Sequence, residues 1–173
     1  MSAILRFVSF PLYIAAKAAR YAQQLMQSTY LESKTRWMQI TIVNETGFPL
    51  KFDDTSYRFR SGRFWTGPGN VEANSETTFS VCNKTFGVGV NGRALYNLSV
   101  SPECTVTVLI QYVNEFFGNI RLTANFVVGE NLPKETVVKV NGSYKKVVVS
   151  CAPGSHGKVT LFFEEEQAAP SSD

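Results

Sequence analysis

The sequence predicts a mainly β protein, an antiparallel β-sandwich preceded by an N-terminal amphipathic α-helix. From Trp37 onward, short segments rich in Val, Ile, Thr and Phe alternate apolar and polar residues, as half-buried strands do. Residues 1–36 lack glycine and follow helical spacing instead. A chain of 173 residues with 44% apolar and 18% charged residues has the composition of a globular domain. We expect a helical segment 1–36, a sandwich 37–163 and a disordered acidic tail 164–173.

The N-terminal segment predicts an amphipathic helix over residues 12–31, with Pro11 in its first turn, where a proline is tolerated. Residues 4–27 are enough helix to cross a hydrocarbon core of about 30 Å. One helix cannot expose a polar stripe to lipid, so it must lie at the interface or assemble with copies around water. Two other readings remain open: the helix packs on its own domain, or residues 1–20 are a cleaved signal peptide.

The sandwich is predicted from eight segments in order along the chain, separated by turn signals such as ETGFP, TGPGN and APGSHG. This number of short strands at this spacing is typical of a sandwich or barrel. The expected strands are 37–44, 56–60, 77–81, 104–113, 119–128, 135–140, 144–150 and 158–163.

The stretch YRFRSGRFW, residues 57–65, combines arginines with aromatic residues. On a strand, Tyr57 and Phe59 face one side and the intervening arginines the other, so core aromatics with solvated arginines are one reading. Phe64 and Trp65 lie between glycines, and we expect them in a loop, partly exposed. Such a surface suits nucleic acid, carbohydrate, an acidic partner or lipid headgroups.

Charge and composition exclude some of these classes of ligand and some classes of function. Residues 1–163 hold 17 basic and 10 acidic residues, which is too weak a charge for a duplex-DNA binder but adequate for an anionic membrane. The single histidine and the spacing of Cys82, Cys104 and Cys151 give no zinc motif. Neither a nucleophile context nor a phosphate-binding loop is recognisable. We therefore expect no enzyme, no metal, no cofactor and no nucleic-acid partner.

The order of these features resembles the actinoporins, small pore-forming cytolysins, and their actinoporin-like relatives. An amphipathic segment precedes a strand that ends in Asn-Glu-Thr-Gly at 44–47, similar to the family's Asn-Glu-Ser-Gly turn. Residues 58–62, RFRSG, resemble the family's Tyr-Phe-Arg-Ser-Gly. The strand TVTVLIQY and the loop 116–119, FFGN, resemble its strand and Trp-Tyr-Ser-Asn loop. The resemblance covers residues 1–130, and 150–163 more weakly.

The resemblance implies a secreted, soluble monomer that binds phospholipid headgroups, oligomerises on the membrane and inserts its N-terminal helix. The family's tyrosine cluster is missing, since Tyr144 is the one tyrosine of residues 130–146, so we expect no strict need for sphingomyelin. The alternative is a lectin-like or adaptor sandwich that binds a ligand without forming pores. The lipid-binding residues would be Arg60, Ser61, Arg63, Phe64, Trp65, Tyr112, Phe116 and Phe117. The pore-lining residues of the helix would be Lys17, Arg20, Gln24 and Gln27.

Overall fold

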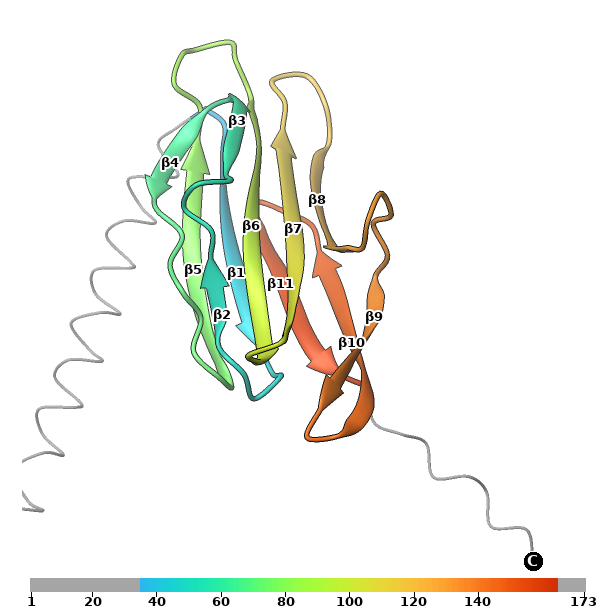
Figure 1. Cartoon of the computed structure of the whole chain (residues 1–173). Helices are drawn as coiled ribbons and strands as arrows, with labels where there is room; N and C mark the ends of the chain where they lie inside the picture. The colour runs from blue at the N-terminus through green and yellow to red at the C-terminus, as the bar shows by residue number, and fades with distance from the viewer. Residues whose placement is uncertain (1–34, 165–173) are drawn as a thin grey trace, which may run out of the picture. The chain divides into compact units, whose positions relative to one another are not determined.

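The computed structural model describes residues 35–164, so the predicted helix 12–31 and the acidic tail beyond Glu164 lie outside the described residues. The described part consists of strands and loops (Figure 1), and it contains no helix long and apolar enough to span a bilayer. The strands are β1 (Trp37–Asn44), β2 (Leu50–Phe52), β3 (Arg58–Ser61), β4 (Arg63–Thr66), β5 (Ser75–Cys82), β6 (Val90–Ser101), β7 (Cys104–Asn114), β8 (Ile120–Val127), β9 (Glu135–Val140), β10 (Ser143–Ala152) and β11 (His156–Phe163).

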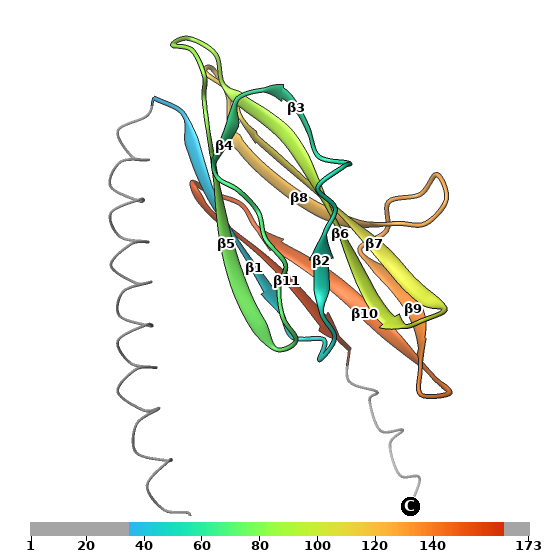
Figure 2. The ribbon, with the colours of Figure 1, turned by 60° about the vertical axis from the view of Figure 1, so that its left-hand side comes forward.

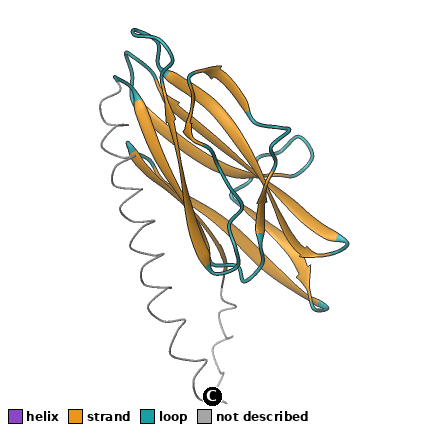
Figure 3. Ribbon diagram, turned by 90° about the vertical axis from the view of Figure 1, so that its left-hand side faces the viewer, coloured by secondary structure: helices purple, strands orange, loops and turns teal. Residues whose placement is uncertain are grey.

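The strands form two sheets, which lie face to face as two layers (Figures 2 and 3). One sheet has the order β4-β5-β1-β11-β10-β9, and the other has the order β2-β6-β7-β8, with β3 also paired to β6. The prediction of a mainly β fold is confirmed for the described residues. A purely antiparallel arrangement is wrong in one place, because β1 and β11 pair in parallel, with Ile42 opposite Val159. Parallel neighbours need a long connection, and here nearly the whole domain supplies it.

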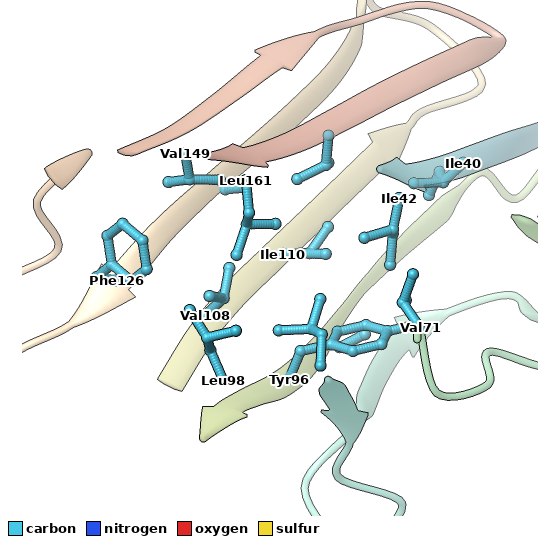
Figure 4. Close-up of a cluster of buried hydrophobic side chains, with 14 of the residues drawn as sticks. Ile40, Ile42, Val71, Tyr96, Leu98, Val108, Ile110, Phe126, Val149 and Leu161 are labelled. Atoms are coloured by element: carbon cyan, nitrogen blue, oxygen red, sulfur yellow. The ribbon is translucent and has the colours of Figure 1, made fainter. Parts of the chain in front are cut away.

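A single hydrophobic core fills the space between the sheets. Alternate residues of β1 point inward, so Met38, Ile40 and Ile42 are fully buried while their neighbours are not. Strand β6 alternates in the same way over its twelve residues. Figure 4 shows the side chains of Ile42 and Leu161 from one sheet facing those from the other sheet. The period-two pattern in the sequence therefore gives both sheets one apolar face each.

The end of β1 is held by the buried side chain of Asn44. Its Nδ2 donates to the carbonyl oxygens of Phe48 at 2.6 Å and Glu72 at 3.1 Å. Its Oδ1 accepts from the hydroxyl of Thr46 at 2.7 Å and from the backbone N–H of Thr46 at 3.2 Å. The Asn-Glu-Thr-Gly turn therefore has a structural role, because the side-chain amide of its asparagine forms hydrogen bonds with backbone groups of two chain segments.

The segment RFW, expected in a loop, forms the edge strand β4, and this expectation is wrong. The chain leaves the smaller sheet at the end of β3 and joins the larger sheet at the start of β4, turning at Gly62 with φ of 95°. A Cβ atom at this position would lie 2.9 Å from the carbonyl oxygen of Cys82, so the crossing needs glycine. The turn signal was therefore read correctly, but the strand after it was missed.

Strand β6 was also missed, because Asn91-Gly92-Arg93 has the composition of a turn. Gly92 is buried in the middle of the sheet, opposite Tyr112. A Cβ atom at position 92 would lie 2.6 Å from the ring of Tyr112 and 2.9 Å from the ring of Phe59. Glycine stands here because two aromatic rings pack directly on the backbone.

We expect Gly92→Ala to lower the free energy of unfolding by about 1–3 kcal/mol, the usual cost of overpacking a filled core. Chemical denaturation of the purified protein measures it. Gly67→Ala is the matched control, because a Cβ atom there meets nothing within 4 Å. Equal stabilities of the two variants would show that the rings do not need the space at Gly92.

Candidate functional site

Two loops meet at the end of the sandwich where β1 begins. They are the β5–β6 loop, residues 83–89, and the β7–β8 loop, residues 115–119, both at the top of Figure 1. A Cβ atom at Gly89 would lie 2.5 Å from the carbonyl oxygen of Asn114 and 2.5 Å from Cα of Glu115. The two loops therefore touch through their backbones and form one surface.

This surface carries a cluster of apolar side chains, the exposed Phe86, Val88 and Phe117 and the half-buried Phe116, which we call the aromatic tip. The side chain of Phe86 is 78% exposed and that of Phe117 is 89% exposed. The ring of Phe116 lies edge-on to both, with centroid separations of 5.7 Å to Phe86 and 4.9 Å to Phe117. Keeping such rings in water is unfavourable, so a clustered exposed patch indicates a binding surface.

The aromatic tip is fixed to the start of β1 by Arg36. Its guanidinium lies 5.4 Å from the ring centroid of Phe116 and donates a hydrogen bond to the carbonyl oxygen of the same residue. The backbone N–H of Asn83 donates to the carbonyl oxygen of Arg36 at 2.9 Å. From the end of β7, directly before the other loop, Nδ2 of Asn114 donates to the carbonyl oxygen of Trp37 at 2.8 Å. Both loops are thus bonded to the first two residues of the sandwich.

The charge around the tip is positive. Lys84 lies in the β5–β6 loop, and Arg63 lies beside Cys82 at the start of β4; both are exposed. Arg121 follows the second loop and pairs with Glu115 at 3.7 Å. Glu115 is the one acidic residue of the two loops. Exposed rings with surrounding cations match the interfacial layer of an anionic bilayer.

The predicted lipid-binding residues are distributed between this end and the interior. Phe116 and Phe117 belong to the aromatic tip, and Arg63 lies at the same end. Arg60 is exposed on β3, while Ser61 is half-buried at the crossing to β4. Trp65 is half-buried on β4.

The other two predicted residues belong to the interior. Phe64 is half-buried against the core, with its ring 4.8 Å from that of Phe59 and 6.0 Å from that of Phe79. Tyr112 is fully buried, and its hydroxyl has no hydrogen-bond partner in the described part of the chain. Burial raises the pKa of Tyr112 far above its ordinary value. The expectation of a loop is wrong for Phe64, which lies on β4; the expected partial exposure agrees with its half-buried side chain.

The sequence analysis missed two members of the tip, Phe86 and Val88. They lie between the expected strands 77–81 and 104–113. A phenylalanine and a valine interleaved with glycines are hard to bury, and that was the signal available for a loop. The predicted pore-lining residues Lys17, Arg20, Gln24 and Gln27 lie outside the described residues.

Residues 35–164 contain no group of three or more His, Cys, Asp and Glu side chains that could hold a metal ion. The cysteines, all within this range, form no disulfide; one is buried and two are half-buried. Asp53 shapes a turn, in which its Oδ1 accepts from the hydroxyl of Thr55 at 2.7 Å. Hydrogen bonds from Ser56 and Thr55 lower the pKa of Asp53. The carboxylate of Asp53 is therefore used within this turn.

A shallow hollow of about 260 Å³ lies at the opposite end of β1, where β5 begins. Its most buried polar group, the amide of Asn44, is already bonded to the backbone. The hollow is lined by Val43, Asn44, Glu45, Asn74, Ser75 and Glu76.

No protein-family model matches the sequence. The search of curated proteins likewise gives no match. Among solved structures, the fold is similar to that of a lipid-binding protein. That protein is Nakanori, with a TM-score of 0.56 and 12% sequence identity over 87% of this chain and 80% of the other. At this identity the similarity establishes a shared fold.

We expect Tyr112→Phe to leave liposome binding unchanged and to keep or raise the free energy of unfolding, by up to about 1 kcal/mol, because it removes a buried hydroxyl without a partner. Tyr112→Ala is the comparison, and the cavity it leaves should cost about 3–5 kcal/mol. Loss of liposome binding by a stable Tyr112→Phe variant would show instead that this hydroxyl reaches the lipid.

Proposed function

We propose that this protein binds phospholipid membranes through the aromatic tip. The observation that carries the proposal is the exposure of Phe86 and Phe117 beside Phe116, in loops whose other residues are mostly small, polar or basic. The tip projects from one end of a rigid sandwich, so both loops can enter the headgroup layer without unfolding any strand. The lipid-binding neighbour of the same fold supports this proposal.

The physical chemistry of the tip supports reversible attachment. Burying two phenylalanine side chains is worth about 3–6 kcal/mol. Each cation close to an anionic surface adds about 1 kcal/mol. Arg63, Lys84 and Arg121 are the exposed cations of this end, and Arg121 shares its charge with Glu115. The cost of association reduces this favourable free energy, so a single copy should dissociate from the membrane readily. Several copies that bind together should be held more strongly.

We further propose that the protein is a pore former, without a catalytic step, and that it is secreted before it meets its target membrane. Residues 1–34 are joined to β1 through Thr35 and Arg36, and Arg36 contacts Phe116. Membrane contact by the tip therefore brings the start of the sandwich close to the bilayer. The amphipathic pattern of residues 12–31 then permits several copies to assemble around water, with Lys17, Arg20, Gln24 and Gln27 facing the lumen.

The alternative is a binding module, a lectin-like or adaptor sandwich that attaches to its ligand and forms no pore. The polar hollow at the other end of β1 favours it, since Glu45 and Glu76 line an open surface there. The saturated bonding of Asn44 counts against it. Leakage measurements separate the two functions, because a binding module needs no membrane-crossing segment.

We expect the double variant Phe86→Ala/Phe117→Ala to bind liposomes at least about tenfold more weakly, since it removes two of the rings that enter the headgroup layer. The assay is cosedimentation with vesicles of phosphatidylcholine and phosphatidylserine. Tyr144→Ala is the matched control, because Tyr144 is 70% exposed but lies beside the β9–β10 turn, away from the tip.

The control variant should bind vesicles as strongly as the unchanged protein. Neither of these two proteins should need sphingomyelin in the vesicles for binding. Unchanged binding by the double variant would reject the aromatic tip as the contact. Binding that appears only with sphingomyelin would reveal a headgroup pocket beyond the tip.

We expect a chain that starts at Ser33 to fold and bind vesicles but to release no trapped dye, because the strands from Trp37 make their own core. The full chain should release the dye. Full leakage from the shortened chain would contradict helix insertion. Tight glycan binding by the full chain, with no leakage from any lipid mixture, would favour the lectin-like module.

A further inference from the structure

Strand β9, Glu135–Val140, is an uncovered sheet edge. In the described part of the chain its backbone pairs only with β10. The other edges are protected: β8 is bonded by its own following loop, through Phe126 N–H to the carbonyl oxygen of Pro133 at 2.8 Å. Strand β2 is bonded to Val71, and β4 is short and irregular in register. An edge left open in this way is a template for another strand.

The side chains of β9 divide cleanly between its two faces. Thr136, Val138 and Val140 point toward the core, and Val138 and Val140 are buried. Glu135, Val137 and Lys139 share the outer face and are all exposed, with Val137 at 59%. Along the outer face of this edge strand, the side chains therefore follow the order acid, valine, base.

We propose that β9 pairs with β9 of a second copy of this chain, antiparallel and centred on Val137. In this register Val137 lies opposite Val137 of the second copy, and Glu135 lies opposite Lys139 of the second copy. Two-fold symmetry makes the ion pair twice, once on each side of the valines. Opposite charges and β-branched residues directly across a strand pair are both favourable.

Other pairings of the same strand lack this match. A parallel arrangement in register would place Glu135 beside Glu135 and Lys139 beside Lys139, which is repulsive. An antiparallel register shifted by one residue would put Glu135 opposite Val140 and turn the outer face of one strand against the inner face of the other. The acid–valine–base order therefore selects the register centred on Val137.

The pairing has a consequence for the orientation of the two copies. Antiparallel strands in one continuous sheet are related by a rotation of 180° about an axis normal to the sheet. The aromatic tips of the two copies then point in opposite directions. Such a dimer presents one tip to a membrane, or one tip to each of two vesicles. The strand pairing itself does not depend on the proposed membrane function, so it is tested in solution.

The test uses sedimentation velocity of the full chain over a range of concentrations, with charge variants that act on the same two contacts. The unchanged protein should dimerise reversibly. Glu135→Lys alone and Lys139→Glu alone each place like charges opposite each other, and each should raise the dimer dissociation constant about tenfold or more. An equimolar mixture of these two variants restores both ion pairs and should form a heterodimer. The double variant Glu135→Lys/Lys139→Glu should dimerise like the unchanged protein.

Lys158→Glu is the matched control, since it makes the same charge change on the exposed face of β11, away from the edge. It should dimerise like the unchanged protein. Thermal unfolding of each variant verifies the fold, because Glu135 also contacts Lys146 at 3.4 Å. The proposal is overturned if the unchanged protein stays monomeric up to about 1 mM. It is equally overturned if the single variants dimerise unchanged, or if their mixture forms no heterodimer.

Discussion

Strand β1 lies in the middle of the larger sheet, between β5 and the parallel strand β11, and the rest of the sandwich is organised around it. Its inward residues, Met38, Ile40 and Ile42, are fully buried, so β1 is tied to the core along its whole length. Its last residue, Asn44, bonds two chain segments at one end, while the carbonyl oxygens of Arg36 and Trp37 accept from two loops at the other. Both ends of the molecule are therefore positioned by the same strand.

This arrangement explains how exposed rings are held in place. The loops that carry Phe86 and Phe117 are connected by hydrogen bonds to the start of β1. Arg36 stacks on Phe116 and bonds to its carbonyl oxygen, so the segment leading out of the N-terminal region also supports the aromatic tip. Arg36 therefore links the start of β1 to the aromatic tip.

The two ends of the sandwich differ in chemistry. Phe86 and Phe117 project at the end where β1 begins, whereas the other end of β1 is polar and closed by the hydrogen bonds of Asn44. A sandwich whose exposed phenylalanines gather at one end would meet a bilayer in a defined orientation. The strand edge β9 runs along the side, so the proposed contact between copies and the proposed contact with lipid use separate surfaces.

Alternation predicted the fold well where strands are built from β-branched residues. Strand β1 was predicted with its observed bounds, and β9 likewise. The prediction failed for β6, where Gly92 resembles a turn but makes room for two rings, a requirement that only the folded neighbours reveal. It failed again at Phe64 and Tyr112, since a motif shows which residues are aromatic but not which way a strand turns them.

For the site, the sequence indicated Phe116 and Phe117 through their resemblance to a known loop, and of the surrounding basic residues it indicated Arg63. Phe86 lies about thirty positions earlier in the chain, and its ring contact with Phe116, together with the hydrogen bonds of Asn83 and Asn114 to the start of β1, shows that its loop belongs to the same surface. Contacts between residues so distant in sequence depend on topology, which local patterns do not encode.

The central claim is that the aromatic tip enters the bilayer, and a depth measurement tests it most directly. A nitroxide label would be attached to Phe117→Cys, and separately to Tyr144→Cys, in a chain whose three native cysteines are replaced by alanine. On phosphatidylcholine–phosphatidylserine vesicles, the label at 117 should become accessible to oxygen and protected from a water-soluble relaxation agent, while the label at 144 stays in water. A label at 117 that remains in water on vesicles to which the protein is bound would contradict the account.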